Sequence, residues 1–256
     1  MREVAGFGIT VGNKILSDLD FADDVALLEM KKQQLQELSN KVSVKVEKVG
    51  LNINIDKTKS MAASGSPVEL LHQNCRVEQV HEFKHLGGWV DYTGEVQNEV
   101  KRRFGMTNAA FNKLKPVWKS KKYSLALKLR LLNSNVLSVL LYASKCWKLD
   151  VGTEKRLTAF ENMCLRRVLN IGWRQRVSNI EVRRRTGQPL ITEVIKKKRW
   201  RYLGHVPRME DSIIPNQVQQ WQPRGRRQRG RPRNTLRRTY DRDLRSAPTS
   251  LKPQWE

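Results

Sequence analysis

The chain has 256 residues, 39% of them hydrophobic, and a formal net charge of +24. This length allows one or two domains, and its longest apolar stretch is too short for a membrane-spanning helix, so we expect no membrane partner. Its three widely spaced cysteines form no C-x₂-C pair, which argues against a zinc site and predicts buried, reduced thiols in an intracellular protein.

The first predicted element is a β-hairpin over residues 6–29 that carries two adjacent aspartates, Asp23 and Asp24. Apolar residues flank this pair, in Leu19–Phe21 and Val25–Leu28, as in the arms of a tight hairpin. Such a hairpin places both carboxylates at the rim of a sheet. Paired oxygen ligands there suit Mg²⁺, or Mn²⁺, and two-metal nucleotidyl transfer. The alternative is a solvated turn, because Asp is a common turn residue.

A helix is predicted over residues 31–49, where apolar residues recur at helical spacing, and Gly50 ends it. The alternating pattern at 51–56 then predicts a strand. Lys57 and Lys59 follow this strand. For either lysine taken singly, a solvated lysine at the end of a strand is almost as good an explanation as a functional role.

A polar loop is predicted over residues 64–74, followed by a second hairpin formed by 77–80 and 83–88. The glycines of this hairpin, Gly87 and Gly88, allow close approach of the backbone to a ligand, or serve only the turn.

From about residue 95 the apolar spacing becomes helical. Five helices are predicted in order: 95–115, 124–147, 153–169 with Thr153 as N-cap, 179–186 capped by Ser178 and ended by Gly187, and 192–203 ended by Gly204.

The positive charge lies mainly in the second part of the chain. Residues 1–100 contain 11 Lys and Arg against 15 Asp and Glu, whereas residues 101–256 contain 38 against 10. Such an excess predicts a polyanionic partner. The arginine-rich stretch near the end lacks core-forming residues, so it is predicted to be disordered alone and to contact phosphates. Its arginines are Arg224, Arg226, Arg227, Arg229, Arg231 and Arg233.

Several phrases resemble one family. F-A-D-D at 21–24 resembles the Y/F-x-D-D box of reverse transcriptases from non-LTR (LINE-type) retrotransposons, and F-K-H-L-G at 83–87 resembles their primer-grip motif. Further phrases follow in the order of the family: L-L-Y-A-S-K-C-W at 140–147, C-L-R-R at 164–167, K-R-W-R-Y-L-G-H at 198–205 and R-G-R-P-R at 229–233. Together they are similar to the RTE-like endonuclease–reverse transcriptases. Ala143 and Lys145–Cys146 depart from the usual Gly and Glu-Thr, as in a diverged copy.

The resemblance implies an α+β fold in three parts. Residues 1–94 would form a partial reverse-transcriptase palm of β-hairpins plus a helix, 95–210 an all-α thumb and helical extension, and 211–256 a basic, largely disordered tail. The implied function is RNA-directed DNA polymerase activity on an RNA template with a DNA primer or duplex, with dNTP as substrate in the intact enzyme.

The resemblance also implies roles for residues. Asp23 and Asp24 would hold Mg²⁺ or Mn²⁺ for catalysis, and either Lys57 or Lys59 would act near the phosphates of the incoming nucleotide, as a proton donor to pyrophosphate. The primer-grip residues that would contact nucleic acid are Phe83, Lys84, Leu86 and Gly87.

In this family a third catalytic aspartate and the fingers lie well upstream of the box, which here starts only about twenty residues after Met1. We therefore expect the carboxy-terminal portion of a larger enzyme, inactive as this chain. The alternatives are a non-catalytic nucleic-acid-binding remnant and an unstable relic with an exposed sheet edge near residues 15–28. An intracellular, nuclear location is expected, and the oligomeric state is left open.

Overall fold

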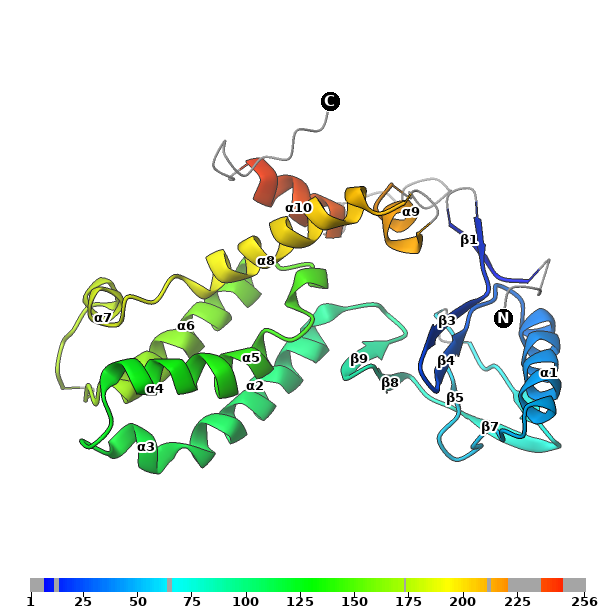
Figure 1. The fold of residues 1–256 in the computed structure, drawn as a ribbon, viewed down its shortest axis with the longest axis horizontal. Coiled ribbons are helices and arrows are strands. Elements are labelled where there is room, and N and C mark those ends of the chain that lie inside the picture. The colour runs from blue at the N-terminus through cyan, green and yellow to red at the C-terminus, as the bar shows by residue number, and fades with distance from the viewer. Residues whose placement is uncertain are drawn as a thin grey trace. The chain divides into compact units, whose positions relative to one another are not determined.

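The computed structural model describes residues 7–11, 14–63, 66–172, 174–210, 213–220 and 236–245. The chain divides into two compact units, which we call the amino-terminal unit (1–95 with 210–227) and the helical unit (96–209 with 228–256). The division at 95/96 lies next to the predicted boundary at 94/95. Figure 1 shows strands with one long helix in the first unit and helices in the second, so the chain is mixed α+β.

Two short β-hairpins, rather than one, occupy the start of the amino-terminal unit. β1 (Ile9–Val11) pairs with β2 (Lys14–Leu16), and β3 (Asp18–Phe21) pairs with β4 (Asp24–Leu27), each pair antiparallel. The prediction of a single hairpin over 6–29 is therefore wrong. Each strand pairs with the strand that follows it because closing a short loop costs less conformational entropy than closing a long one.

α1 (Lys32–Lys48) forms as predicted and provides the small core of this unit. Leu38 and Val42 are buried on one face of α1 and pack with Phe7. Gly50 follows the helix with φ +78°, a left-handed conformation that glycine adopts without a steric penalty. The apolar spacing and the glycine therefore predict this helix and its end correctly.

The strand predicted at 51–56 is not formed. Residues 51–54 have no regular structure and 55–57 form a turn. Asn54 explains the difference, because its Oδ1 accepts a hydrogen bond from the backbone N–H of Lys57 (3.0 Å) and its carbonyl accepts one from Thr58 Oγ1 (2.7 Å). A side chain that satisfies local backbone groups competes with strand pairing.

The remaining strands of the unit form a three-stranded sheet and a hairpin. β5 (Lys59–Ser60), β7 (Cys75–Gln79) and β6 (Leu70–His72) lie in that order, with β5 parallel and β6 antiparallel to β7. β8 (Glu82–His85) pairs with β9 (Gly88–Asp91) as an antiparallel hairpin.

The predicted pairing of 77–80 with 83–88 is therefore wrong, and β6 shortens the predicted loop at 64–74. Two tight turns explain the observed pairing. Gln73 and Asn74 have φ values of 47° and 62°, and Leu86 and Gly87 have 47° and 78°. Two-residue turns with positive φ at both positions match the twist of the flanking strands, so each turn joins its immediate neighbours.

The helical unit is built around one apolar core, whose fully buried members include Leu132, Leu140, Leu157, Leu165 and Ile195. None of the helices in the described residues is both long and apolar enough to cross a membrane. The elements are α2 (Val96–Lys113), α3 (Lys115–Lys119), α4 (Leu125–Leu131), a π-helical segment (Leu132–Leu137), α5 (Ser138–Leu140), a 3₁₀ turn (Ser144–Cys146), α6 (Val151–Val168), α7 (Asn179–Thr186), α8 (Ile191–His205), a 3₁₀ turn (Val206–Arg208) and α10 (Leu236–Arg245).

The predicted ends of α7 are confirmed. Ser178 Oγ accepts a hydrogen bond from the backbone N–H of Glu181 (3.2 Å), and Gly187 ends the helix with φ +62°. For α6 the predicted cap is wrong, because Asp150 is the N-cap and its Oδ1 accepts from the N–H of Thr153 (2.7 Å).

Two other helix boundaries differ from the prediction. The apolar segment 124–147 begins at its N-cap Ser124, but Ala143 has φ +54° and separates α5 from the 3₁₀ turn. α8 begins at Ile191, one residue early, and continues through Gly204 to His205. Glycine weakens a helix by only about 1 kcal/mol, which tertiary packing can override.

Two helices lie in 211–256, which was predicted to be largely disordered. α9 (Ile214–Gln220) belongs to the amino-terminal unit and α10 to the helical unit. α10 is held by a fully buried ion pair, in which Arg199 of α8 donates to Asp243 Oδ2 (2.5 Å) and also to the carbonyl of Trp147 (2.7 Å). The arginine-rich composition of this part of the chain therefore does not prevent α10 from packing against α8.

The cysteines differ from one another in burial. Cys164 is buried as predicted, and burial raises the pKa of its thiol to about 12, so it stays protonated. Cys75 and Cys146 are exposed, and the prediction of buried thiols is wrong for these two.

The cap of α6 gives a test of this fold. Asp150→Ala should lower the free energy of unfolding by about 1 kcal/mol at pH 7, because the Thr153 N–H loses its acceptor. Hydrogen bonding from the Thr153 backbone lowers the pKa of Asp150. The ionised carboxylate therefore stabilises the fold above its unfolded-state pKa, and this contribution is lost as pH falls through the lowered folded-state pKa.

Asp150→Asn keeps a capping oxygen but cannot ionise, so it serves as the matched control. The difference in urea unfolding free energy between the original chain and Asp150→Asn should shrink as the pH falls below about 5. A difference that does not change with pH would contradict the assigned role of the carboxylate.

Candidate functional site

The acidic pair lies at the end of the β3–β4 hairpin. The turn is made by Ala22, with φ +53°, and Asp23, while Asp24 is the first residue of β4 and pairs with Phe21. Both carboxylates are exposed. Neither takes part in a hydrogen bond or ion pair with the described residues, so both are accessible to a ligand.

Two further aspartates lie on the same hairpin. Asp18 and Asp20 are two apart on β3, so their side chains share one face of the strand. Burial raises the pKa of Asp20, and the charge of Asp18 and a hydrogen bond to Asp18 raise it further. Asp24 shares the opposite face with Phe21, its cross-strand partner. The two-residue spacing of Asp18 and Asp20 in the sequence was the signal that could have identified this second acidic pair.

The acidic residues of the described part of the chain do not complete a metal site. No group of three His, Cys, Asp or Glu side chains among these residues could hold a metal ion. Mg²⁺ requires near-octahedral oxygen coordination, and two-metal catalysis requires carboxylates that bridge both ions. Asp23 and Asp24 alone therefore do not fit a Mg²⁺ or Mn²⁺ centre of this kind, and no catalytic step through a metal is derived.

The two candidate lysines have different surroundings. The Lys59 ammonium forms an ion pair with the carboxylate of Glu78, its neighbour across the β5–β7 ladder. Lys57 is exposed in the turn after Asn54. The structure thus gives Lys59 a partner within the sheet and leaves Lys57 more accessible to a ligand.

The predicted primer-grip residues occupy the β8–β9 hairpin. Leu86 and Gly87 form its turn and are exposed, and Lys84 is exposed on β8. Phe83 is half-buried opposite Val90. The hairpin therefore presents a cation and a protruding turn to solvent. The predicted arginines Arg224, Arg226, Arg227, Arg229, Arg231 and Arg233 lie outside the described residues.

The helical unit carries a strong cationic excess that is exposed. Residues 96–209 contain 27 Lys and Arg but only 6 Asp and Glu. Five of these six acidic side chains already have internal partners: Glu99 with Arg103, Asp150 with Thr153, Glu154 with Arg242, Glu161 with Arg183, and Glu181 with Arg184.

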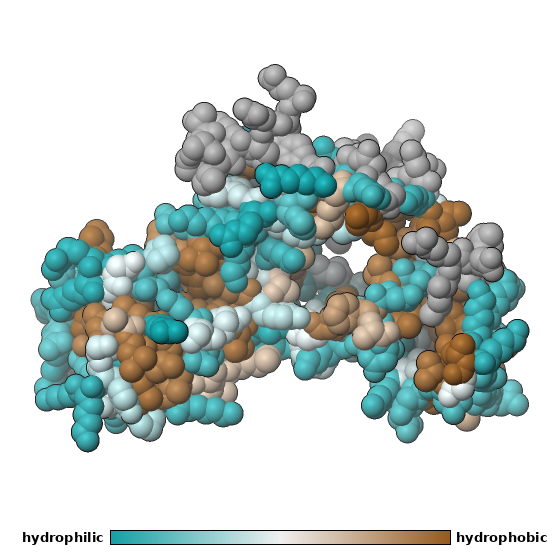
Figure 2. Space-filling view, in the orientation of Figure 1, coloured by the Kyte–Doolittle hydropathy of each residue, from teal (hydrophilic) through white to brown (hydrophobic). Residues whose placement is uncertain are grey.

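Most of the cations face solvent. Figure 2 shows hydrophilic residues over much of the visible surface of this unit, with hydrophobic residues grouped near α4. Exposed cations of the α3–α4 region and of α8 include Lys115, Lys119, Lys121, Lys122, Lys197, Lys198 and Arg201. Exposed cations and the exposed Tyr123 ring are groups that can contact phosphates and bases.

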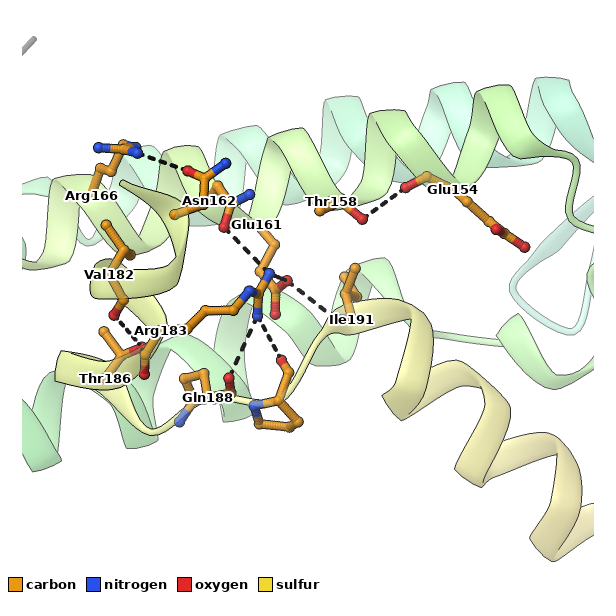
Figure 3. A network of polar contacts seen from close by, with 12 residues as sticks. Glu154, Thr158, Glu161, Asn162, Arg166, Val182, Arg183, Thr186, Gln188 and Ile191 are labelled. Carbon is orange, nitrogen blue, oxygen red and sulfur yellow. Dashed lines mark hydrogen bonds and ion pairs between the residues drawn. The ribbon is translucent and has the colours of Figure 1, made fainter. Parts of the chain in front are cut away.

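A buried polar network holds α6, α7 and the start of α8 together (Figure 3). Glu161 on α6 accepts from the Arg183 guanidinium (2.6 Å) and from the backbone N–H of Ile191 (3.2 Å). Arg183 also donates to the carbonyl of Pro189 (3.0 Å) and to Asn162 Oδ1 (3.3 Å). Burial raises the pKa of Glu161, and the hydrogen bond and charge of Arg183 act in the opposite direction.

Comparison with known proteins links the chain to a transposon-derived protein. Residues 110–142 match a family described as a domain of unknown function (DUF6451). The chain is 27% identical over 231 residues to a Caenorhabditis elegans protein named as an uncharacterized transposon-derived protein, covering 83% of this chain and 79% of that protein. No solved structure matches the chain. The similarity to the Caenorhabditis elegans protein supports a transposon-related origin.

The Glu161–Arg183 pair gives a second test. Arg183→Leu should lower the free energy of unfolding by about 3–5 kcal/mol, because it leaves Glu161 buried without its cation. The double variant Glu161→Leu/Arg183→Leu removes both charges and should be less destabilised than Arg183→Leu alone. Chemical denaturation of the three proteins measures both differences.

Arg184→Leu is the control, because the Arg184–Glu181 pair is exposed and solvent screens its charges, so its loss should change the free energy of unfolding much less than Arg183→Leu does. A double variant that unfolds as easily as Arg183→Leu would show that the buried charge is not the source of the loss.

Proposed function

We propose that this chain is the carboxy-terminal portion of an RNA-directed DNA polymerase of non-LTR retrotransposon origin, and that it binds nucleic-acid duplex without extending a primer. The amino-terminal unit would correspond to the end of the palm and the helical unit to the thumb and its extension. The similarity to a transposon-derived protein supports the origin, and the ordered phrases from F-A-D-D to R-G-R-P-R support the enzyme lineage.

The observation that carries the binding function is the imbalance of charge in the helical unit. Five of the six acids in 96–209 are engaged internally, so the 27 Lys and Arg of this stretch leave a large positive excess for an external partner. A polyanion with regularly spaced phosphates matches such a surface, and binding releases its condensed counterions.

The absence of primer extension follows from the acidic hairpin. Asp23 and Asp24 supply two adjacent carboxylates, and the described residues supply no third acidic ligand beside them. Without carboxylates that bridge two metal ions, nothing stabilises the negative charge on both the attacking hydroxyl of the primer and the leaving pyrophosphate. Substrate binding alone does not lower the barrier to reaction, because binding must be tighter in the transition state to do so.

Primer extension by this chain is the second candidate function. One observation favours it: the β3–β4 hairpin forms and leaves both carboxylates of the F-A-D-D segment exposed. In that case Mg²⁺ or Mn²⁺ would be the cofactor and dNTP the substrate.

One experiment separates the two candidates. Extension of a DNA primer on an RNA template is measured with Mg²⁺ and with Mn²⁺, alongside binding to the same duplex at increasing salt. We expect tight binding and no extension. The logarithm of the association constant should fall linearly with the logarithm of the salt concentration, with a slope of about 0.9 for each duplex-DNA phosphate neutralised.

The variant Asp23→Asn/Asp24→Asn should bind the duplex at least as tightly, because it removes negative charge near a polyanion. Asp18→Asn/Asp20→Asn is the matched control on the same hairpin. Extension that disappears only in Asp23→Asn/Asp24→Asn would establish a working site and refute the proposed loss of activity. Binding that is absent or insensitive to salt would refute the proposed binding function.

A further inference from the structure

A hollow of about 540 Å³ opens on the helical unit, and two of the residues that line it, Arg166 and Arg167, belong to the C-L-R-R phrase. Its walls come from α6, from the connection that follows α6, and from the first residue of α7. Three carboxamides line it, Asn162, Gln175 and Asn179, together with the arginines Arg166 and Arg167. Ala159, Met163 and Ile171 supply apolar wall.

The oxygen atoms of all three carboxamides are already used. Asn179 Oδ1 accepts from the Arg166 guanidinium (2.7 Å), and Asn162 Oδ1 accepts from the Arg183 guanidinium (3.3 Å). Gln175 Oε1 accepts from the backbone N–H of Gly172 (3.3 Å). Guanidinium and backbone N–H groups can only donate, so these contacts fix which end of each amide is oxygen and which is nitrogen.

The nitrogen atoms of the same carboxamides remain available. Within the described part of the chain, none of the three NH₂ groups donates a hydrogen bond, and each can donate two. In its hydrogen bonds with the described residues, Arg166 uses only its Nη2 atom, which donates to Asn179 and to the carbonyl of Val177 (2.8 Å). Each carboxamide oxygen thus already accepts one hydrogen bond, whereas its NH₂ group donates none, so most of the unused hydrogen-bonding capacity of these side chains is for donation.

The charge around the hollow is positive. None of the described residues that line it is acidic. Glu161, adjacent to Asn162 on α6, is buried and neutralised by Arg183. Arg167 is exposed, and so are Arg174 and Arg176 in the connection. A ligand here must accept several hydrogen bonds and carry negative charge.

We infer that this hollow binds a phosphate group. Phosphate presents anionic acceptor oxygens in several directions, which suits donors contributed by three separate segments, whereas a carboxylate presents two oxygens in one plane. The phosphate can belong to a nucleic-acid backbone or to a free nucleotide or inorganic phosphate. The first source rests on the proposed function, and the second is independent of it.

Asn179→Asp is the most direct test, because it keeps the shape of the side chain and replaces only the NH₂ group by an oxygen atom. The remaining oxygen still accepts from Arg166, while the NH₂ donor becomes an anionic acceptor. A carboxylate in the first turn of α7 also interacts favourably with the helix dipole, so the fold is retained. Gln175→Glu makes the same exchange at an exposed position beside Gly172. Asn108→Asp, exposed on α2 and outside the hollow, is the control of equal charge.

Two titrations of the full chain distinguish the sources. Inorganic phosphate is titrated by calorimetry, and a labelled RNA–DNA duplex by fluorescence anisotropy at several salt concentrations. For backbone phosphate, Asn179→Asp and Gln175→Glu should each weaken duplex binding by about tenfold and reduce the salt slope by about 0.9, and Asn108→Asp should change both much less.

For free phosphate, the same two variants should lose inorganic phosphate binding while duplex binding matches that of Asn108→Asp. This result would support the hollow even where the original chain fails to bind duplex, in which case only the proposed function fails. If both variants behave like Asn108→Asp in both titrations, the hollow is not a phosphate site and the inference is wrong.

Discussion

The helical unit depends on one buried carboxylate, that of Glu161, which joins three helices. An ionised carboxylate in a protein interior is costly unless a cation and hydrogen-bond donors surround it. Arg183 supplies the cation, and the Ile191 N–H supplies a further donor at the start of α8. The same guanidinium holds the carbonyl of Pro189 and the amide oxygen of Asn162. One ion pair thus fixes the turn between α7 and α8 and also orients an amide of the phosphate hollow.

The amino-terminal unit is held together differently. Among its described residues one small cluster consists of Phe7, Leu38 and Val42 with partly buried neighbours, and Val11, Leu70 and Val77 are buried outside that cluster. Most of its strands form two-stranded hairpins, which are marginally stable in water without further packing. Phe21 is 65% exposed beside the acidic pair. Local turns and a few polar contacts maintain this unit, so it should open at lower free energy than the helical unit.

The features that the sequence predicted correctly are those that depend on neighbouring residues. Ser178 and Gly187 bound α7 as predicted, because capping involves residues within one helical turn. The cap of α6 was missed because Asp150 and Thr153 both carry a capping oxygen, and the sequence does not show which of them accepts. Strand partners depend on pairs of left-handed turn residues, and neither pair here contains the strongest sequence pattern for such a turn.

Longer-range features could not be read from the sequence. Asp243 is buried against Arg199, which lies 44 positions away, and the surrounding arginines predict disorder instead. The donor-lined hollow could not be predicted from the sequence either, because its chemistry depends on which end of each amide forms a hydrogen bond within the fold. The F-A-D-D hairpin was recognised from its own residues, whereas a complete ligand set requires acids from separate strands.

Burial distinguishes the acidic residues that the fold needs for its stability from those that it does not need. Glu161 and Asp243 are almost fully buried, and loss of either partner would leave an uncompensated interior charge. Asp23 and Asp24 are exposed, so the fold places little constraint on them and their presence is no argument for structural need. Two adjacent carboxylates repel each other and also repel a nucleic-acid backbone, which weakens any contact of this hairpin with duplex. Attraction to a polyanion must therefore come from cations elsewhere in the chain, above all from those of the helical unit, most of which face solvent.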